Sequence, residues 1–520
     1  MDKNLFLAVA LSILIYLGWF GLMNRLYPAP AAPAKQSSAI EAVESPASVA
    51  PAPTPYAAPE SKSAFQGDGL AGAFPYTVGK VELKVQAYGA AIASYRYPGP
   101  LGAVELVSTA KPGFFATWPE LEFKAAPGPG LVFTAAHPSG ASIRKEYSFD
   151  PASNLHTLRV EVSNPTRKPL ALEPWTVSVG PGLGTVQNEL KENADQWRAG
   201  LLRPPPQGKT QPVLEEHPTK EDGRWNEQPF RWTGVDNRYF LAALVPAEAD
   251  FARAWTGSES VSEKLRAPLA RAEARALTLA PGQARVYEVP FYFGPKGYTH
   301  LSGLGLGFEK SVQFGWFDQI GRFALKVLFR LQRYTHNYGW SIIILTLILQ
   351  VLMFPLTYKQ MKSAAIMKKI QPELAKVQQK FAKDPQRLNQ EMMELYRKHG
   401  ANPLGGCLPI LVQMPVFVAL FNALRNAWEL HGAPWIFWVK DLSAHDPFYV
   451  LPLVMGGIMF LQSKMNPVQM ADPVQSKMFQ YMPVIFTFMF LNFPAGLVLY
   501  WLTNSVLGFL TQLALKSRWE

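Results

Sequence analysis

The sequence predicts a polytopic α-helical membrane protein of six spans that also carries an all-β sandwich domain outside the membrane. Three observations lead to this prediction. Long apolar runs lie near both ends of the 520-residue chain, and the region between them alternates apolar and polar residues, with turns rich in Gly and Pro. Charged residues make up only 17% of the chain, and hydrophobic residues make up 48%. That charged share is low for a purely soluble protein.

Residues 1–24 are predicted to form an N-terminal transmembrane anchor. The run from Leu5 to Phe20 is apolar apart from Ser12. Small residues after Tyr27 also fit the cleavage site of a signal peptide, so both readings stay open. The length of the run and its aromatic end favour a retained anchor. Residues 25–72 follow as a linker rich in Pro and Ala, a composition that favours extended chain over a packed core.

Residues 73–300 are predicted to form the β-sandwich domain. Apolar residues at every second position predict strands with one buried face, and two runs show this most clearly: Val81, Leu83 and Val85, and Leu158, Val160 and Val162. The region has no nucleophile-elbow, zinc-protease or P-loop motif. The nearby carboxylates Glu189, Glu192 and Asp195 are interpreted as a solvated face.

Residues 308–335 are predicted to contain an amphipathic helix, with an apolar stripe that includes Ile320 and Phe323 and a basic opposite face. Such a helix is typical of the membrane interface. The alternative is a helix packed on the β domain.

The remaining spans are expected at about residues 338–356, 404–424, 447–462, 478–493 and 495–513. Between the first two, residues 357–403 contain ten Lys or Arg and four acidic residues. The positive-inside rule places this loop in the cytoplasm, and counting spans outward places the β domain in the periplasm and both termini inside. An aromatic belt at the outer interface is then expected from Trp340, Trp428, Trp435 and Trp438.

The cytoplasmic loop is predicted to form a helical hairpin over residues 358–400. Two apolar stripes at helical spacing can pair with each other, and Asp384-Pro385 is typical of an N-cap followed by a first-turn proline. The basic surface, including Lys368, Lys369 and Lys380, indicates solvation, or docking of ribosomal RNA or lipid headgroups.

The spans contain a few uncharged polar residues and no catalytic constellation. Thr346 and Gln350 lie four apart and therefore share a helix face, while Gln413 and Asn504 lie in two other spans. An unpaired amide in hydrocarbon costs roughly 2–7 kcal/mol, so these groups must bond to each other or face water. The single cysteine, Cys407, excludes an intramolecular disulfide and a cysteine-based zinc site. We expect neither a metal nor a cofactor.

Several motifs resemble the YidC membrane protein insertase family. They include Asn402-Pro403-Leu404-Gly405-Gly406-Cys407, Gln413-Met414-Pro415-Val416-Phe417 and Phe493-Pro494-Ala495-Gly496-Leu497. The resemblance covers about residues 338–516. The anchor, linker and β domain are similar to the Gram-negative branch of that family.

The resemblance implies a five-helix insertase core around a hydrophilic groove and a non-enzymatic function. Such an insertase moves apolar segments of nascent proteins from the cytoplasm into the bacterial inner membrane, alone or with the Sec translocon. The implied partners are nascent membrane proteins, the Sec translocon, the ribosome and membrane lipids. The implied groove residues are Thr346, Gln350, Gln413, Tyr500, Trp501 and Asn504. The implied first contacts on the hairpin are Lys368, Lys369, Lys380 and Asp384.

The sequence departs from the family pattern at Gln350, where an arginine is usual, and at Trp501, where a tyrosine is frequent. Two other functions remain open: a secondary transporter and a periplasmic ligand-binding scaffold. The transporter is disfavoured because no internal repeat is evident.

Overall fold

The computed structural model describes residues 73–108, 113–128, 130–218, 222–262, 265–381, 384–400, 408–465 and 473–519. The predicted anchor, the linker and Cys407 lie outside these residues.

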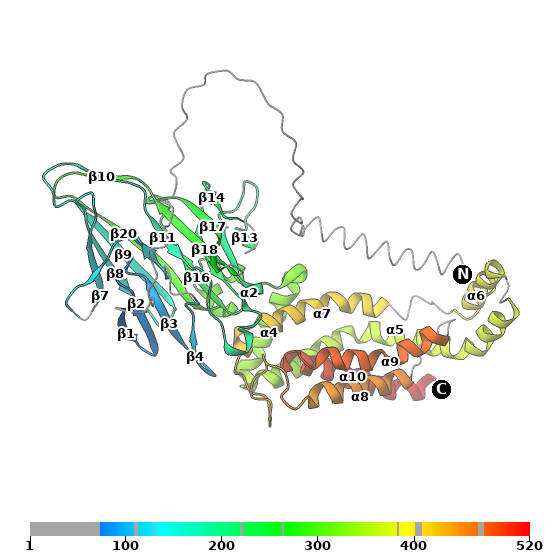
Figure 1. Ribbon diagram of the computed structural model, residues 1–520. Coiled ribbons are helices and arrows are strands. Elements are labelled where there is room, and N and C mark those ends of the chain that lie inside the picture. The colour runs from blue at the N-terminus through cyan, green and yellow to red at the C-terminus, as the bar shows by residue number, and fades with distance from the viewer. Residues whose placement is uncertain are drawn as a thin grey trace, which may run out of the picture. The chain divides into compact units, whose positions relative to one another are not determined.

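The β domain consists of antiparallel sheets (Figure 1). In the described part, the largest sheet contains, in spatial order, β13 (Val213–Pro218), β12 (Arg198–Arg203), β15 (Trp232–Asp236), β16 (Phe240–Leu244), β20 (Ala284–Pro295), β9 (Leu155–Ser163), β8 (Ser142–Ser148), β7 (Leu131–Ala136) and β6 (Lys124–Ala125). The second contains β14 (Arg224–Asn226), β17 (Phe251–Ser262), β18 (Leu265–Ala274), β11 (Thr176–Val179) and β5 (Ala116–Thr117). Smaller sheets are formed by β1 (Phe74–Val78), β2 (Val81–Val85), β3 (Ile92–Gly99) and β4 (Gly102–Glu105), and by β10 (Leu170–Leu172) with β19 (Leu277–Leu279).

The two large sheets pack face to face, with β12 and β15 against β17 and β18. The alternation predicted from the sequence gives the buried faces of strands in both the small and the large sheets. On β2, Val81, Leu83 and Val85 are buried and the residues between them are exposed. Leu158, Val160 and Val162 of β9 are also buried. The prediction of a β-rich domain is therefore confirmed.

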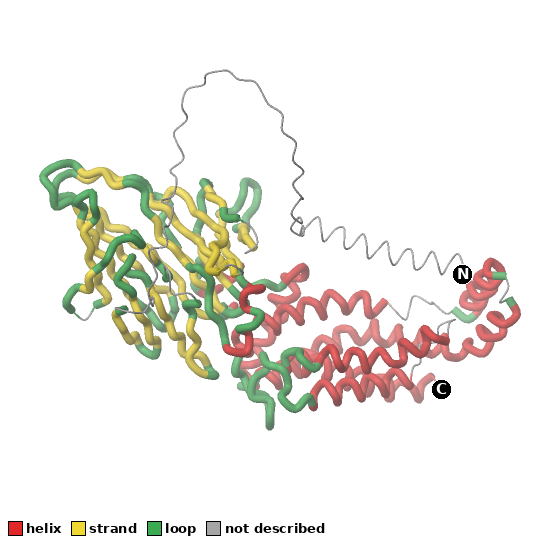
Figure 2. The backbone as a smooth tube through the Cα atoms, in the orientation of Figure 1, coloured by secondary structure: helices red, strands yellow, loops and turns green. Residues whose placement is uncertain are grey.

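Among the described residues, helices dominate after residue 300, and strands dominate before it (Figure 2). Two short helices, α2 (Asn193–Gln196) and α3 (Tyr298–Gly303), belong to the β-rich segment. The long helices are α4 (Asp318–Thr335), α5 (Tyr338–Lys380), α6 (Pro385–Lys398), α7 (Leu408–Asn426), α8 (Val450–Met465), α9 (Pro473–Phe490) and α10 (Ala495–Trp519). Short 3-10 turns are η1 (Gln187–Glu189), η2 (Phe308–Ser311), η3 (Gly315–Phe317) and η5 (Trp428–Leu430).

Helix α5 differs from the prediction because the span and the first hairpin helix form one continuous helix of 43 residues. Asn337 begins it by accepting hydrogen bonds from the backbone N–H of Gly339 and Trp340. Pro355 and Pro372 lie inside the helix. A proline inside a helix removes one backbone donor and favours a kink, but the helix continues past both prolines.

Helix α4 packs mainly against α5 and α7. Its buried side is formed by Gly321, Ala324, Leu325 and Leu328. The apolar stripe expected from the sequence lies elsewhere, and its member Phe323 is 66% exposed. Other members of the stripe, Val327 and Leu331, are partly buried against the helical core, so the position of this helix in the membrane interface stays a prediction.

The loop after α7 contacts the β domain. Trp428 packs on Phe240 with ring centroids 5.0 Å apart, so it does not face lipid as expected. The carboxylate of Glu192 lies 3.9 Å from the guanidinium of Arg425 in α7, and Glu189 is ion-paired with Arg238. Two of the three carboxylates predicted to form a solvated face therefore lie in ion pairs at or near this contact.

Two described helices are long and apolar enough to cross a membrane, namely residues 338–380 and 495–515, and the apolar helices at 450–465 and 481–490 are shorter. The predicted spans correspond to α5, α7, α8, α9 and α10 in order. The count of six spans remains a prediction.

Candidate functional site in the helical core

Helix α10 lies at the centre of the candidate site because it packs against α5, α7 and α8 (Figure 1). It carries three of the six predicted groove residues, Tyr500, Trp501 and Asn504. Small or apolar neighbours on the same helix, such as Leu497, Val498 and Leu499, are buried in the core cluster. The helix therefore presents its polar groups among apolar packing.

The structure brings Gln413 of α7 and Asn504 of α10 together. The Gln413 Nε2 donates to the Asn504 Oδ1 at 3.4 Å, and the Tyr500 hydroxyl is also hydrogen-bonded to the Gln413 side chain. Each amide has two N–H donors and a carbonyl with two acceptor sites, so one long bond uses little of this capacity. Both amides are only half-buried. This pair therefore has the composition and exposure of a hydrated lining.

Thr346 and Gln350 of α5 have different environments. Thr346 is buried, and its hydroxyl donates to the carbonyl of Ile342 in its own helix at 2.7 Å. Gln350 is half-buried, and its amide has no hydrogen-bond partner within the part of the chain that the structure describes. Gln350 is thus open to an external polar group, while Thr346 is already satisfied. No hydrogen bond among the described residues joins either of them to the Gln413–Asn504 pair.

Trp501 packs in an aromatic cluster. Its ring lies 4.5 Å from that of Phe417, 5.2 Å from that of Phe490 and 6.2 Å from that of Phe486, measured between centroids. The side chain is half-buried. Part of the ring stabilises the core, and only the remainder is available to another apolar group.

Two glutamines in the core were not among the predicted groove residues. Gln462 of α8 donates through Nε2 to the backbone carbonyl of Ser505 at 2.9 Å. The Nε2 of Gln512 in α10 is buried and has no hydrogen-bond partner among the described residues. Their signal in the sequence was the same as for Gln413, a lone amide in an apolar helix.

The hairpin has the predicted stripe-to-stripe packing. Ile370 and Leu374 of α5 are buried against a half-buried set that includes Met392, Leu395 and Tyr396. Asp384 caps α6, since its Oδ1 accepts from the backbone N–H of Arg387 at 3.1 Å. The predicted contact residues Lys368, Lys369 and Lys380 are all exposed.

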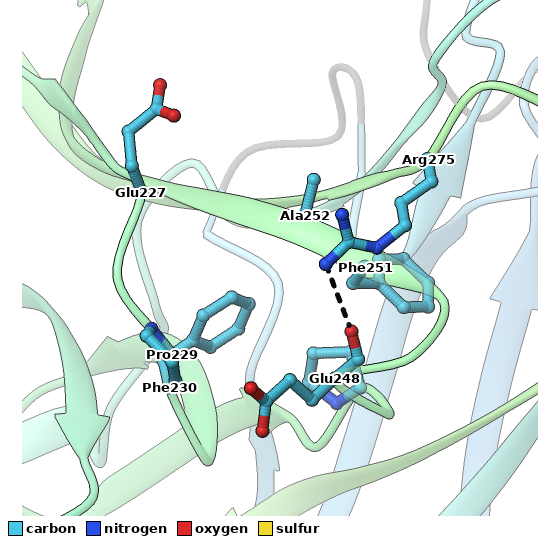
Figure 3. A pocket seen from close by; sticks show the side chains of 8 residues that line it. Glu227, Pro229, Phe230, Glu248, Phe251, Ala252 and Arg275 are labelled. Carbon is cyan, nitrogen blue, oxygen red and sulfur yellow. Dashed lines mark hydrogen bonds between the residues drawn. The ribbon is translucent and has the colours of Figure 1, made fainter.

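A hollow in the β domain is a second candidate (Figure 3). Its lining combines acidic, basic and apolar side chains: Glu227, Pro229, Phe230, Pro246, Glu248, Phe251, Ala252 and Arg275. The Arg275 guanidinium donates to the backbone carbonyl of Glu248 at 3.5 Å. The cavity is about 60 Å³, whereas small-molecule sites are roughly 300–1,000 Å³. It has room for a few water molecules only.

Neither location resembles an enzyme or metal site. Among the described residues, no group of three or more His, Cys, Asp or Glu side chains is arranged to hold a metal ion. The helical core instead has amides in apolar helices beside a basic hairpin.

The chain is similar to known proteins. A family model described as 60Kd inner membrane protein matches residues 330–520, and one described as YidC periplasmic domain matches residues 120–329. The membrane protein insertase YidC of Endomicrobium trichonymphae is 40% identical over 423 residues, which cover 79% of this chain and 78% of that protein. This chain belongs to the YidC membrane protein insertase family.

Further YidC proteins are similar. The membrane protein insertase YidC of Geobacter sulfurreducens is 39% identical over 391 residues, covering 74% of this chain and 71% of that protein. The crystal structure of an active YidC insertase covers 85% of this chain and 92% of its own, with a TM-score of 0.41 and 17% identity. The match to the crystal structure of YidC from Thermotoga maritima covers 84% of this chain and 99% of that one, with a TM-score of 0.32 and 14% identity.

Proposed function

We propose that this chain is a membrane protein insertase that moves apolar segments of nascent proteins from the cytoplasm into the inner membrane. It works without enzymatic chemistry. Transfer of the segment's apolar surface out of water supplies the free energy, at about 25 cal/mol per Å². The role of the protein is to lower the barrier for the polar residues that must enter the membrane with that segment.

The Gln413–Asn504 pair is the observation that carries this proposal. Two half-buried amides from α7 and α10 share one hydrogen bond of 3.4 Å, and the described residues occupy only part of their donors and acceptors. A polar substrate tail can exchange hydrogen bonds with these groups and with water, and so avoid the full cost of desolvation. Gln350 adds a third amide from α5.

The topology proposed for this function has six spans. The basic hairpin of α5 and α6 lies in the cytoplasm, and the β domain lies in the periplasm. The ten basic residues of the loop at 357–403, against four acidic ones, support this orientation. The hairpin then forms the first contact with the substrate or the ribosome, and the Sec translocon is a further partner. Lys369 and Lys380 present exposed charge for that contact.

The double variant Gln413→Leu, Asn504→Leu tests the groove. In a strain depleted of its own insertase, this variant should insert a single-span substrate several-fold more slowly than the wild type, as measured by protease protection. Thr511→Val is the matched control, because the Thr511 hydroxyl donates to the Leu507 carbonyl of its own helix and to no other described residue. Equal insertion rates for the wild type and the double variant would contradict the role of these two amides in a substrate groove.

Gln350 provides a separate test. Gln350→Leu removes the amide and should slow insertion, whereas Gln350→Arg adds the fixed charge usual in the family and should favour substrates with acidic tails. Site-specific crosslinkers at Gln350 and Trp501 should both capture a nascent membrane protein. The absence of crosslinks at both positions would refute the placement of the substrate path.

A further inference from the structure

The loop between α7 and α8 exposes large aromatic side chains. Phe437 is 84% exposed and Phe448 is 65% exposed, and Tyr449 and Trp340 are also exposed. We call Trp340, Phe437, Phe448 and Tyr449 the aromatic collar. Contiguous exposed apolar surface of this kind marks an interaction site.

Ring contacts connect most of the collar. Trp340 lies 5.9 Å from Trp435, Phe437 lies 6.0 Å from Trp438, and Trp438 lies 6.3 Å from Phe448, between centroids. Tyr449 directly follows Phe448 and begins the approach to α8. Phe437 and Phe448 are therefore connected through Trp438, and Trp340 packs on the same loop at Trp435.

The buried side chain of Asp446 fixes the conformation of this loop. Its carboxylate is 1% exposed and accepts three hydrogen bonds, from the Trp438 indole N–H at 2.9 Å, the Phe448 backbone N–H at 3.1 Å and the Leu451 backbone N–H at 2.7 Å. A buried carboxylate with three donors has defined geometry and links the loop to the first turn of α8.

The backbone of the loop is also constrained. Phe437 and Tyr449 have φ angles of 50° and 56°, a left-handed conformation that costs a residue with a side chain about 1–2 kcal/mol. At the other end, the Asn337 amide donates to the Trp435 carbonyl at 3.0 Å. A Cβ on Gly339 would lie only 2.1 Å from the Trp435 ring, so this close approach requires glycine. The fold thus maintains the exposure of the rings at an energetic cost.

The collar continues the apolar outer surface of two predicted spans. Leu453 and Val454 of α8 and Leu347 of α5 are exposed large apolar side chains in the helices that begin next to it. Helix α8 has 16 residues, about 24 Å in length, while a bilayer core is about 30 Å thick. Aromatic rings are the side chains preferred at the boundary between acyl chains and headgroups.

We propose that the aromatic collar inserts into the lipid interface of the outer leaflet and fixes the position of the bilayer boundary at the start of α8. Because α8 is shorter than the bilayer core, its other end then lies within the cytoplasmic leaflet, where the substrate enters. This inference rests on the membrane orientation in the proposed function. The occupant is phospholipid, since the collar is continuous with lipid-facing helix surface and its loop has only Lys440 as an exposed cation.

A spin-label experiment on the full chain tests this. In a Cys407→Ser background, Phe437→Cys and Phe448→Cys are labelled with a nitroxide in vesicles of phosphatidylcholine and phosphatidylglycerol. Collisions with oxygen, which partitions into lipid, are compared with those of a neutral, water-soluble nickel complex. Both labels should collide several-fold more with oxygen than with the nickel complex. Val286→Cys, at an exposed position of strand β20, is the aqueous control and should show the reverse.

Three outcomes decide the matter. Preferential oxygen collision at both collar positions supports lipid insertion. Nickel access equal to that at residue 286 overturns it, and protection from both reagents overturns it in favour of a covering protein. Insertion activity of the same cysteine variants is measured in parallel in the depletion strain. If the collar positions are accessible to water while the variants still insert substrate, this inference is refuted and the proposed function is not. Because Phe437 is 84% exposed, its replacement should not prevent folding.

Discussion

Glu429, in the 3-10 turn after α7, should make the contact between the β domain and the loop after α7 sensitive to pH. Its Oε2 is buried and lacks a hydrogen-bond partner among the described residues. Burial raises the pKa of this carboxyl from 4.5 to about 7. The groups facing it are the Tyr298 backbone N–H, which donates to the carboxylate, and the phenols of Tyr292 and Tyr338.

The sign of the effect follows from proton binding. Below pH 4.5 the Glu429 carboxyl is protonated both in the folded state and in the locally opened state. Its ionisation then does not change the stability of the contact. Between pH 4.5 and about 7 the open state loses its proton and the folded state keeps it, and stability therefore falls as the pH rises. The pKa difference corresponds to about 3 kcal/mol, which solvent screening at this half-buried side chain reduces to about 1–2 kcal/mol.

Glu429→Gln removes the titration and keeps an oxygen for the Tyr298 N–H. Hydrogen exchange of the amides at 427–432, corrected for the intrinsic rate, should be about five- to tenfold slower in the variant than in the wild type at pH 8. At pH 4.5 the two should be equal. Glu288→Gln, at an exposed position on β20, is the control and should have no effect at either pH. Equal exchange rates in Glu429→Gln and the wild type at pH 8 would refute the raised pKa of the Glu429 carboxyl. The same slowing of exchange in the variant at pH 4.5 as at pH 8 would refute it too.

Two further predictions concern packing and capping. Gly456→Ala should lower the thermal stability of the full chain in detergent by several degrees, because its Cβ would lie 1.8 Å from the Thr487 hydroxyl, whereas Gly457→Ala, with open space around the added carbon, should not. Comparable midpoints for the two variants would contradict the close contact of α8 and α9. Asp384→Ala should destabilise the hairpin by about 1 kcal/mol through loss of the bond from the Arg387 N–H, while Asp384→Asn should retain most of it; hydrogen exchange at the start of α6 measures this. Equal protection in both variants would mean that the cap contributes nothing.

Much of the helical core was predictable because its signals are local. The hairpin stripes of Ile370, Leu374 and Leu395 follow helical spacing, and Asp384-Pro385 marks the start of a helix from two neighbouring residues alone. The positions of α7, α8, α9 and α10 follow from apolar runs of limited length. The end of α5 did not follow, because a proline inside a helix and a proline at its end have the same sequence signature.

The sequence by itself determined which segments are strands or apolar helices, where the lone amides lie, and which family the motifs resemble, because each depends on the order of neighbouring residues. Only the tertiary structure decided which amides meet. Gln413 reaches Asn504 across 91 positions, while Thr346 turns to its own helix. It also decided that Trp428 is covered by Phe240 while Phe437 is left exposed. Local patterns set the polarity of a surface, but the neighbour that covers it comes from distant parts of the chain.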